Sequence, residues 1–480
     1  MNRIYFIDKY NKMSAPMKAS IWFVICSVIQ KSIATITVPI FTRILTEEQY
    51  GLYTVYQSWY GILIIFATLN LYAGVFNNGM IKFENDRNCF QSSLIGLSSV
   101  LTSVLLMIYL LFHNLFNEFM GLTTPLVLAM FVDFFCSVGL SFWTTRNKFE
   151  YKYRSLIIVT ILIAVLTSVL GIAGVLLTEY KAEARILSIV IVQVIFGGTL
   201  YILSVRSGKK IYVKKYWNFA LAFNLPLIPH YLSMSVLNQA DRIMISKMVG
   251  NDKAAIYSVA YSVAMLMTII TQSINNSYVP WTYKALREKR YNDLRKNSNM
   301  LLALVGGMSL FVMIFAPEVI AVFAGGNYME AIFAIPPVAG SVYFMFLYPL
   351  FCNIEFYYEQ NKFIMVASSV GAVLNIILNW IAIPLFGYIV AGYTTLICYI
   401  IFAVVHYTFM KKICKSKEIK EDLYDFKFIT IFSCLYCGVI AFISFTYSNT
   451  ILRYVIIAIL VIVIIIMREK IRALFQAIKK

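Results

Sequence analysis

The stretch SLIIVTILIAVLTSVLGIAGVLL (Ser155–Leu177) contains no charged residue. A helix needs about 20 apolar residues to cross the hydrocarbon layer of a membrane, and this run is long enough. Similar runs recur along all 480 residues, of which 60% are hydrophobic and 13% charged. Soluble proteins have about 25% charged residues. A soluble enzyme, a disordered scaffold and a fibrous repeat are therefore excluded, and the sequence predicts an all-α polytopic membrane protein.

The apolar runs predict about fourteen transmembrane helices, joined by loops too short to form separate domains. The first seven predicted spans are 19–42, 53–76, 92–113, 122–143, 154–178, 186–205 and 219–248. The other seven are 254–281, 299–324, 331–352, 363–385, 388–410, 428–447 and 452–467.

The formal net charge of +18 would indicate a nucleic-acid partner in a soluble protein. We expect no nucleic acid here, because about 33 of the basic residues fall in cytoplasmic segments when the N-terminus is placed inside. Few basic residues fall elsewhere: Arg43, Lys181, Arg185, Lys253 and Arg453 outside, and Lys31, Arg242 and Lys247 within spans. This bias predicts that both termini are cytoplasmic and that basic loops contact anionic membrane lipids.

A faint internal repeat relates two halves of the chain. The segment TRILTEEQYGLYTV (Thr42–Val55) aligns with SKMVGNDKAAIYSV (Ser246–Val259), six predicted spans later. Such a shift preserves the direction of the chain across the bilayer, as in parallel transporter repeats. We therefore expect two six-helix lobes followed by two further helices. The predicted parts are an N-terminal lobe at 1–205, a cytoplasmic linker at 206–218, a C-terminal lobe at 219–410, and a basic loop, two helices and a cytoplasmic tail at 411–480.

Ionisable side chains in or beside the spans are the candidate functional residues, since a charge at mid-bilayer costs about 2.5–3.5 kcal/mol. These candidates are Lys31, Arg43, Asp133, Asp241, Arg242 and Lys247. An alternative interpretation is structural: Lys31 and Asp133 would pair to hold two spans together, and Asp241 and Arg242 would anchor helix ends or pair with neighbouring residues. Arg43 would then only extend to the outer interface.

The candidate cations outnumber the candidate carboxylates. A cavity lined by them would be positive and would suit an anionic ligand such as a phosphate or pyrophosphate. Tyr257 and Tyr261 are candidates for stacking on sugar rings, although aromatic belts at the membrane interfaces are the alternative explanation.

The sequence has no phosphate-binding loop, no hydrolase motif and no metal-spaced group of cysteines and histidines. Cys352 and five other cysteines lie in apolar runs, where a thiol behaves as a small hydrophobic group. We therefore expect no catalytic residue, no cofactor and no metal, and transport driven by a coupling ion (H⁺ or Na⁺) or by the substrate gradient.

Several stretches resemble the polysaccharide transporter branch of the multidrug/oligosaccharidyl-lipid/polysaccharide (MOP) exporter superfamily, the O-antigen flippases. They are FTRILTEEQYGLYTV, DRIMISKMVGNDKAAIYSVAYSV, SYVPWTYK, GGNYMEAIFAIPPVAG and LNIILNWIAIPLFGYIVAGYTTLICY. The resemblance covers nearly the whole chain in order. It implies fourteen spans, two six-helix lobes around a central cavity, and substrate contacts at Arg43, Asp241, Arg242 and Lys247, with Lys31 and Asp133 as further candidates.

The resemblance also implies an activity: moving an undecaprenyl-pyrophosphate-linked oligosaccharide from the cytoplasmic to the outer leaflet of the bacterial inner membrane by alternating access. The polysaccharide polymerase machinery is then an expected partner. A flippase of cell-wall precursors is a close relative of this interpretation.

Two other classes of protein remain as alternatives. An ion-coupled exporter of small cationic compounds should line its cavity with acidic groups. A membrane-embedded glycan-modifying enzyme should have a sizeable outer loop or a catalytic His/Asp group, and neither is visible in the sequence. The flippase is the preferred prediction, and we expect the protein not to be an enzyme.

Overall fold

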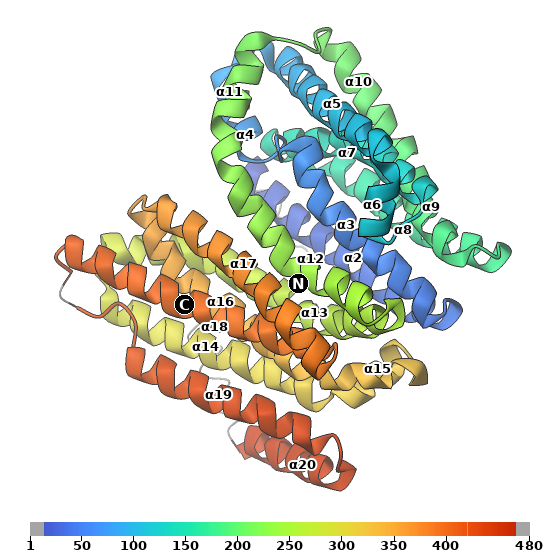
Figure 1. Cartoon of the computed structure of the whole chain (residues 1–480). Coiled ribbons are helices and arrows are strands. Elements are labelled where there is room, and N and C mark those ends of the chain that lie inside the picture. The colour runs from blue at the N-terminus through green and yellow to red at the C-terminus, as the bar shows by residue number, and fades with distance from the viewer. Residues whose placement is uncertain (1–13, 420, 467–480) are drawn as a thin grey trace, which may run out of the picture. The chain divides into compact units, whose positions relative to one another are not determined.

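A computed structural model describes residues 14–419 and 421–466 (Figure 1). All regular elements within these ranges are helices, which confirms the predicted all-α fold. The described chain contains 12 helices that are long and apolar enough to cross a membrane. Helices α3 (Glu47–Thr68) and α20 (Thr450–Ile466), at the second and fourteenth predicted spans, are not among these 12. The count of fourteen therefore stays a prediction, and the two chain ends predicted to be cytoplasmic lie outside the described residues.

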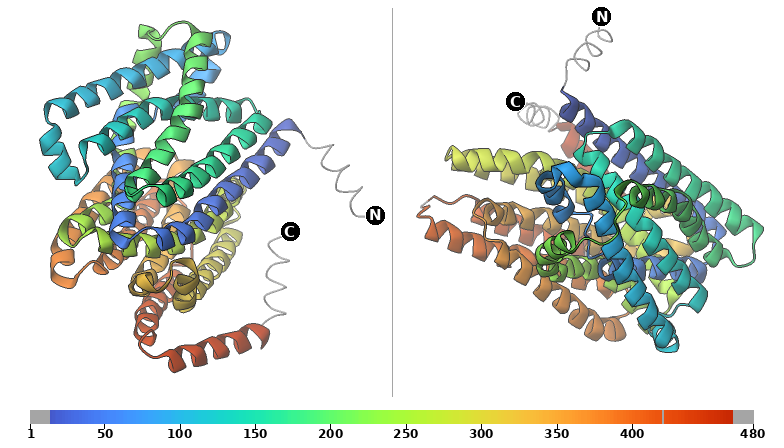
Figure 2. Two further views of the ribbon diagram at one scale, coloured as in Figure 1. Left: turned by 90° about the vertical axis from the view of Figure 1, so that its right-hand side faces the viewer. Right: turned by 90° about the horizontal axis from the view of Figure 1, so that it is seen from above.

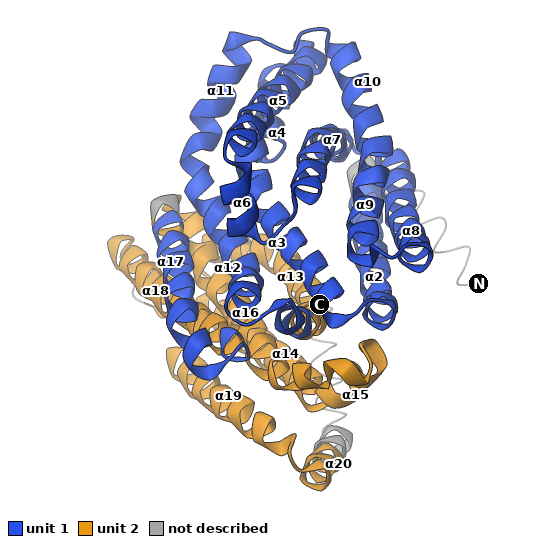
Figure 3. Cartoon of the chain, turned by 45° about the vertical axis from the view of Figure 1, so that its right-hand side comes forward, with its two compact units in different colours: residues 1–258, 365–391 blue, residues 259–364, 392–480 orange. Residues whose placement is uncertain are grey.

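The chain forms two compact units (Figure 3). The first comprises residues 1–258 and 365–391, and the second comprises residues 259–364 and 392–480. The three boundaries between them fall inside α13 (Asn251–Arg287), α17 (Asn361–Phe386) and α18 (Val390–Ser416), so each of these helices contributes to both units. The lobe boundaries predicted from the internal repeat stay a prediction.

The first unit contains α2 (Ala15–Ile44), α3, α4 (Gly74–Lys82), η1 (Glu84–Asp86), α5 (Arg87–Leu111), α6 (His113–Met120), α7 (Thr124–Phe149), α8 (Tyr153–Leu177), α9 (Lys181–Gln193), η2 (Val194–Gly198), α10 (Thr199–Gly208), α11 (Lys214–Asn224), η3 (Leu225–Leu227) and α12 (Ile228–Met248). Helices α2 and α8 pack side by side, as both views in Figure 2 show in dark blue and teal. Helix α3 packs on α12, and α5 packs on α10.

An aromatic cluster fills the core between α4, α5, α7 and α11. Phe76 stacks on Phe90 with ring centroids 5.9 Å apart, and Phe142 meets the Phe76 ring edge-on at 5.0 Å. Phe83 and Tyr216 extend the cluster, with centroids 4.7 Å apart. Aromatic pairs in these geometries add about 0.5–1.5 kcal/mol each beyond the burial of their surface. The cluster therefore fixes the short helix α4 against its longer neighbours.

The beginning of α3 is defined by local sequence. The hydroxyl of Thr46 accepts a hydrogen bond from the backbone N–H of Gln49, and the Gln49 side chain accepts one from the backbone N–H of Thr46. This reciprocal capping box satisfies two N–H groups that would otherwise lack partners at the helix end. Gly51, one turn further on, lies against the first residue of α13, because a Cβ atom there would overlap the carbonyl group of Asn251. Only glycine permits this close approach of two helix backbones.

The second unit contains α14 (Tyr291–Ile314), α15 (Ala316–Phe323), η4 (Gly326–Phe333), α16 (Ile335–Tyr357), most of α18 (Val390–Ser416), α19 (Phe426–Thr446) and α20. Most side chains of α16 are buried, and this helix packs on α14 and α19. Tyr343 of α16 contacts the rings of Phe432 and Tyr436 of α19 at 5.7 and 4.7 Å. Because polar residues are scarce on α16 and burial is nearly complete, α16 is the central helix of this unit.

Candidate functional site

The most deeply buried of the charged candidates from the sequence is Asp241 on α12, which is 2% exposed. Its Oδ2 accepts a hydrogen bond of 2.7 Å from the hydroxyl of Tyr257 on α13. Its Oδ1 accepts one of 2.7 Å from the side-chain amide of Asn379 on α17. All three residues belong to the first unit. Hydrogen bonds to a carboxylate are short and strong, so they lower the cost of burying this charge.

A fourth polar side chain extends this group. The Asn379 amide also lies 3.3 Å from Oδ1 of Asn375, one turn earlier on α17, and both asparagines are fully buried. We call Asp241, Tyr257, Asn375 and Asn379 the Asp241 cluster. A carboxylate with phenol and amide oxygens beside it is a set of hard oxygen donors, which is the kind of environment that hard cations prefer.

Two cations follow Asp241 on α12. Arg242 is half-buried, and its guanidinium donates hydrogen bonds to the Asn238 carbonyl at 2.7 Å and to Oε1 of Gln239 at 2.9 Å. Lys247 is exposed, and its Nζ donates to the carbonyl of Glu118 and lies 5.8 Å from the ring centroid of Phe119. Helix α12 thus holds a buried acid and two more accessible cations, and their role in binding a substrate stays a prediction.

The cationic candidates on α2 are exposed. Lys31 lies near the middle of the helix, and Arg43 lies in its last turn, where its guanidinium donates to the Pro39 carbonyl at 2.8 Å. An arginine at the C-terminal end of a helix interacts favourably with the unpaired carbonyls there. The role of both residues in binding a substrate stays a prediction.

Asp133 on α7 is buried, with 4% exposure, and its partner is a tyrosine. The hydroxyl of Tyr60 on α3 donates to Oδ1 of Asp133 at 3.5 Å. Among the described residues Asp133 makes no ion pair, so the alternative interpretation in which Lys31 pairs with Asp133 is wrong. The physical reason is that Asp133 points into the first unit towards α3, whereas Lys31 is on an exposed face of α2.

The two candidate tyrosines on α13 differ in their surroundings. Tyr257 is fully buried in the Asp241 cluster, so in this conformation its ring is not open to a sugar. Tyr261, one turn later, is half-buried and belongs to the second unit. Asn375 and Asn379 are not among the candidates predicted from the sequence. Two asparagines four residues apart in an apolar span were the available signal, since polar side chains at membrane depth face protein or water.

These features define a class. The chain is a multi-pass helical membrane protein, and its buried ionisable groups lie inside membrane-spanning helices, which is typical of substrate or ion pathways in transporters.

The comparison with known families gives the particular family. The chain belongs to the polysaccharide biosynthesis protein family, whose model matches residues 17–286. The MatE family model matches residues 226–381. The resemblance to the MOP superfamily is thus confirmed, and the protein is a MOP-type transporter. A curated relative, protein 1 of the Lsg locus of Haemophilus influenzae, is 22% identical over 374 residues, which cover 75% of this chain and 89% of the relative.

Solved structures share the fold. The inward closed lipid II flippase MurJ superposes with a TM-score of 0.64 at 15% identity, covering 94% of this chain and all of that chain. An inward-facing multidrug resistance transporter of the MATE family gives a TM-score of 0.61 at 15% identity, covering 82% of this chain and 96% of the transporter. A MOP superfamily transporter from Pyrococcus furiosus gives 0.56 at 15% identity, with coverages of 84% and 96%.

Proposed function

We propose that the protein is a flippase that moves an undecaprenyl-pyrophosphate-linked oligosaccharide, an O-antigen or capsule/exopolysaccharide repeat unit, from the cytoplasmic to the outer leaflet of the bacterial inner membrane. The observation on which this rests is the match of more than half of the chain to the polysaccharide biosynthesis protein family. The fold shared with a lipid II flippase supports the same kind of substrate.

The physical task explains why such a protein is needed. The sugar and pyrophosphate head of the substrate cannot cross hydrocarbon without losing its hydration, whereas the lipid tail is already soluble there. A transporter that offers the head a polar path and leaves the tail in the lipid removes the larger barrier. Alternating access between two sides of the membrane then makes the movement possible without an open channel.

The headgroup is proposed to contact the accessible cations. Arg43 and Lys247 are exposed and Arg242 is half-buried in the conformation described, so these residues are more accessible than the buried Asp241. Lys31 is a further exposed candidate. Arginine binds phosphate oxygens through two parallel N–H groups, which gives both affinity and orientation for a pyrophosphate.

The Asp241 cluster is the proposed site of ion coupling. A buried carboxylate that accepts hydrogen bonds from a phenol and an amide can instead bind a cation or a proton. Either event alters the hydrogen bonds between α12, α13 and α17. The coupling ion, H⁺ or Na⁺, would then favour one conformation of these helices over another. The polysaccharide polymerase machinery is the proposed protein partner.

A second function is kept because of one observation. The buried ionisable candidates in the first unit, Asp133 and Asp241, are both acids, while the cations are more accessible. An exporter of small cationic compounds needs buried acids of this kind. Related multidrug resistance transporters share the fold.

Deletion of the gene in the source organism, followed by complementation, tests the proposal. We expect the deletion strain to lose one surface glycan and to accumulate its undecaprenyl-linked precursor in the cytoplasmic leaflet. A normal glycan with increased sensitivity to cationic drugs would favour the exporter instead. Growth arrest with accumulation of lipid II would assign the protein to cell-wall precursors.

A further inference from the structure

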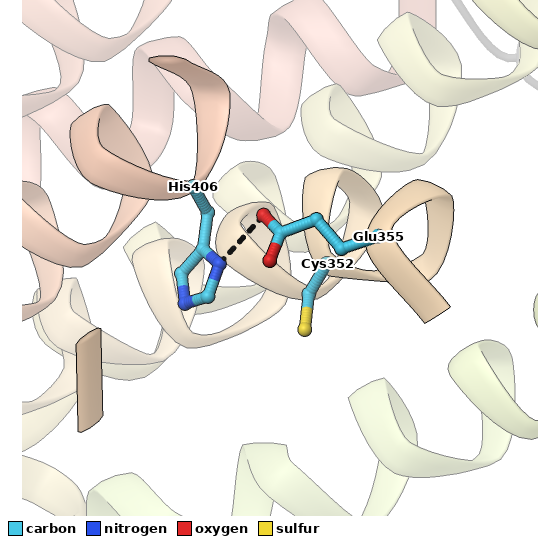
Figure 4. A group of neighbouring side chains, drawn as sticks. All are labelled: Cys352, Glu355 and His406. Atoms are coloured by element: carbon cyan, nitrogen blue, oxygen red, sulfur yellow. Dashed lines mark hydrogen bonds and ion pairs between the residues drawn. The ribbon is translucent and has the colours of Figure 1, made fainter. Parts of the chain in front are cut away.

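Three chemically reactive side chains meet inside the second unit, and none of them belongs to the Asp241 cluster of the first unit. Cys352 and Glu355 lie on α16, and His406 lies on α18 (Figure 4). All three are buried, with exposures of 4%, 0% and 2%. A thiol, a carboxylate and an imidazole together are unusual in a membrane helix bundle, where a buried ionisable group usually has a function.

The backbone places these groups on facing surfaces. Cys352 and Glu355 are three residues apart on α16, so their side chains project from one face of that helix. His406 approaches from α18, with Nδ1 of its ring directed at the Glu355 carboxylate and 2.8 Å from Oε1 (Figure 4). One potential ligand atom from each residue can be chosen so that all three lie within 4.8 Å of one another.

The hydrogen bonds leave one atom of this group unsatisfied. Oε2 of Glu355 is buried and has no hydrogen-bond partner among the described residues. An unsatisfied buried polar group costs about 1–3 kcal/mol, and more when it is charged. A plain histidine–glutamate hydrogen bond would use Oε1 only, and it explains neither the second oxygen nor the neighbouring thiol.

We propose that Cys352, Glu355 and His406 bind a borderline-soft divalent metal ion, for which Zn²⁺ is the best fit. Zinc takes sulfur, nitrogen and carboxylate oxygen as ligands, and three protein ligands leave a fourth position for water. Thiolate and imidazole select against Mg²⁺ and Ca²⁺, which prefer oxygen donors. Glu355 would supply a negative charge, and the Cys352 thiol would lose its proton on binding, so the ligands would neutralise the ion.

The spacing of the three groups is compatible with this ion. Zinc bond lengths in tetrahedral geometry place ligand atoms about 3.3–3.7 Å apart. On zinc binding, the distance of 2.8 Å between Nδ1 of His406 and Oε1 of Glu355 must therefore increase slightly. Ligand atoms that lie further apart, at up to 4.8 Å, must move closer together. Side-chain rotations supply movements of this size. The bound ion would link α16 to α18 and stabilise the second unit.

This site differs from the sequence-based expectation that the chain has no metal site. The sequence does not predict this site, because His406 is 51 residues from Glu355 and further still from Cys352. No known spacing of metal ligands connects the three residues. Only the packing of α18 against α16 brings the histidine to the other two groups.

The test uses the full-length, untagged protein in detergent, stripped with a chelator and then given one equivalent of Zn²⁺ or Co²⁺. We expect about one zinc per chain after desalting, and a cobalt spectrum with a sulfur charge-transfer band and the intense visible bands of tetrahedral coordination. Cys352→Ser and His406→Gln should each bind at least about tenfold more weakly, since even outer-shell partners are worth 10–100-fold. The matched control is Cys398→Ser, which removes a different buried cysteine, one on α18. This variant should bind zinc as tightly as the parent chain does.

Two results would overturn the proposal. One is a parent chain that retains no stoichiometric zinc. The other is equal retention by Cys352→Ser and the parent chain, with no cobalt–sulfur band in either. Both would leave the group as a structural hydrogen bond between His406 and Glu355. If His406→Gln fails to fold, Cys352→Ser still decides, because it leaves that hydrogen bond in place. The assay involves no transport, so its outcome is independent of the proposed function.

Discussion

The carboxylate of Asp241 on α12 accepts a 2.7 Å hydrogen bond from the side-chain amide of Asn379 on α17, although 138 residues separate the two in sequence. The bond joins two distant segments of the first unit. Because the other carboxylate oxygen is bonded to Tyr257 on α13, three helices meet at one buried charge. Any change in the charge or occupancy of this group therefore acts on three helices together.

The first prediction concerns the stability of the Asp241 cluster. Asp241→Ala removes the hydrogen bond that Tyr257 donates to the carboxylate and the one that Asn379 donates to it, which should cost about 1–3 kcal/mol for each bond lost. Asp241→Asn keeps one acceptor oxygen and should cost less. Thermal unfolding in detergent, followed by size-exclusion chromatography, measures both. Asp252→Asn at the start of α13 is the control and should change little, and equal stability of the parent and Asp241→Ala chains would contradict the assignment.

The second prediction concerns transport by the same cluster. If Asp241 binds the coupling ion, the Asp241→Asn variant should fold, but its transport activity should no longer depend on the ion gradient. Flipping of a lipid-linked oligosaccharide in liposomes, with and without imposed H⁺ and Na⁺ gradients, measures this response. A variant that keeps the full dependence on either gradient would remove Asp241 from ion coupling.

The helical elements could largely be predicted from the sequence, because long apolar runs leave few alternatives in a bilayer. The predicted span 154–178 closely matches α8 (Tyr153–Leu177). The predicted span 53–76 instead corresponds to most of α3 and the beginning of α4. The chain leaves α3 at Leu69 and Asn70, whose backbone φ angles are positive, in the left-handed region. The capping box at Thr46 and Gln49 was the local signal for an earlier start of α3.

The candidate site was less predictable. Asp241 stands out in the sequence because charges inside apolar spans are rare. Its partner Asn379 does not, because α17 is apolar around most of its surface, and such a pattern does not fix the rotation of a helix. For the same reason Tyr60, and not Lys31, is the partner of Asp133. Pairings of this kind depend on tertiary packing, which sequence periodicity does not determine.

The third prediction uses Gly51. A methyl group there would overlap the Asn251 carbonyl, so Gly51→Ala must push α3 away from the start of α13. Overpacking of this kind costs about 1–3 kcal/mol. Gly307→Ala in α14 is the matched control, because a Cβ atom at Gly307 meets nothing within 4 Å and alanine is the better helix former. The Gly307→Ala variant should unfold at the same temperature as the parent chain or higher, and the Gly51→Ala variant should unfold at a lower temperature. The reverse order would contradict the packing described.

The fourth prediction separates the partners of Asp133. A double-mutant cycle between Tyr60→Phe and Asp133→Ala should show a coupling free energy of up to about 1 kcal/mol, because the two side chains share a hydrogen bond that each substitution removes. The matched cycle between Lys31→Met and Asp133→Ala should show additivity within about 0.5 kcal/mol, because these side chains make no ion pair. Coupling in the second cycle and none in the first would restore the structural pair that the sequence suggests.

The fifth prediction tests the cations on α12. Arg242→Ala and Lys247→Ala each remove an accessible charge that we propose meets the pyrophosphate, so both should strongly reduce display of the surface glycan while the amount of protein in the membrane stays unchanged. The lipid-linked precursor should accumulate in the cytoplasmic leaflet. Arg242→Lys should restore activity only in part, because lysine cannot bind a phosphate through two parallel N–H groups. Lys181→Ala, at the start of α9, is the control and should behave like the parent chain. Normal glycan display by both alanine variants would show that headgroup recognition lies elsewhere in the protein, and the proposed substrate contacts of Arg242 and Lys247 would then be wrong.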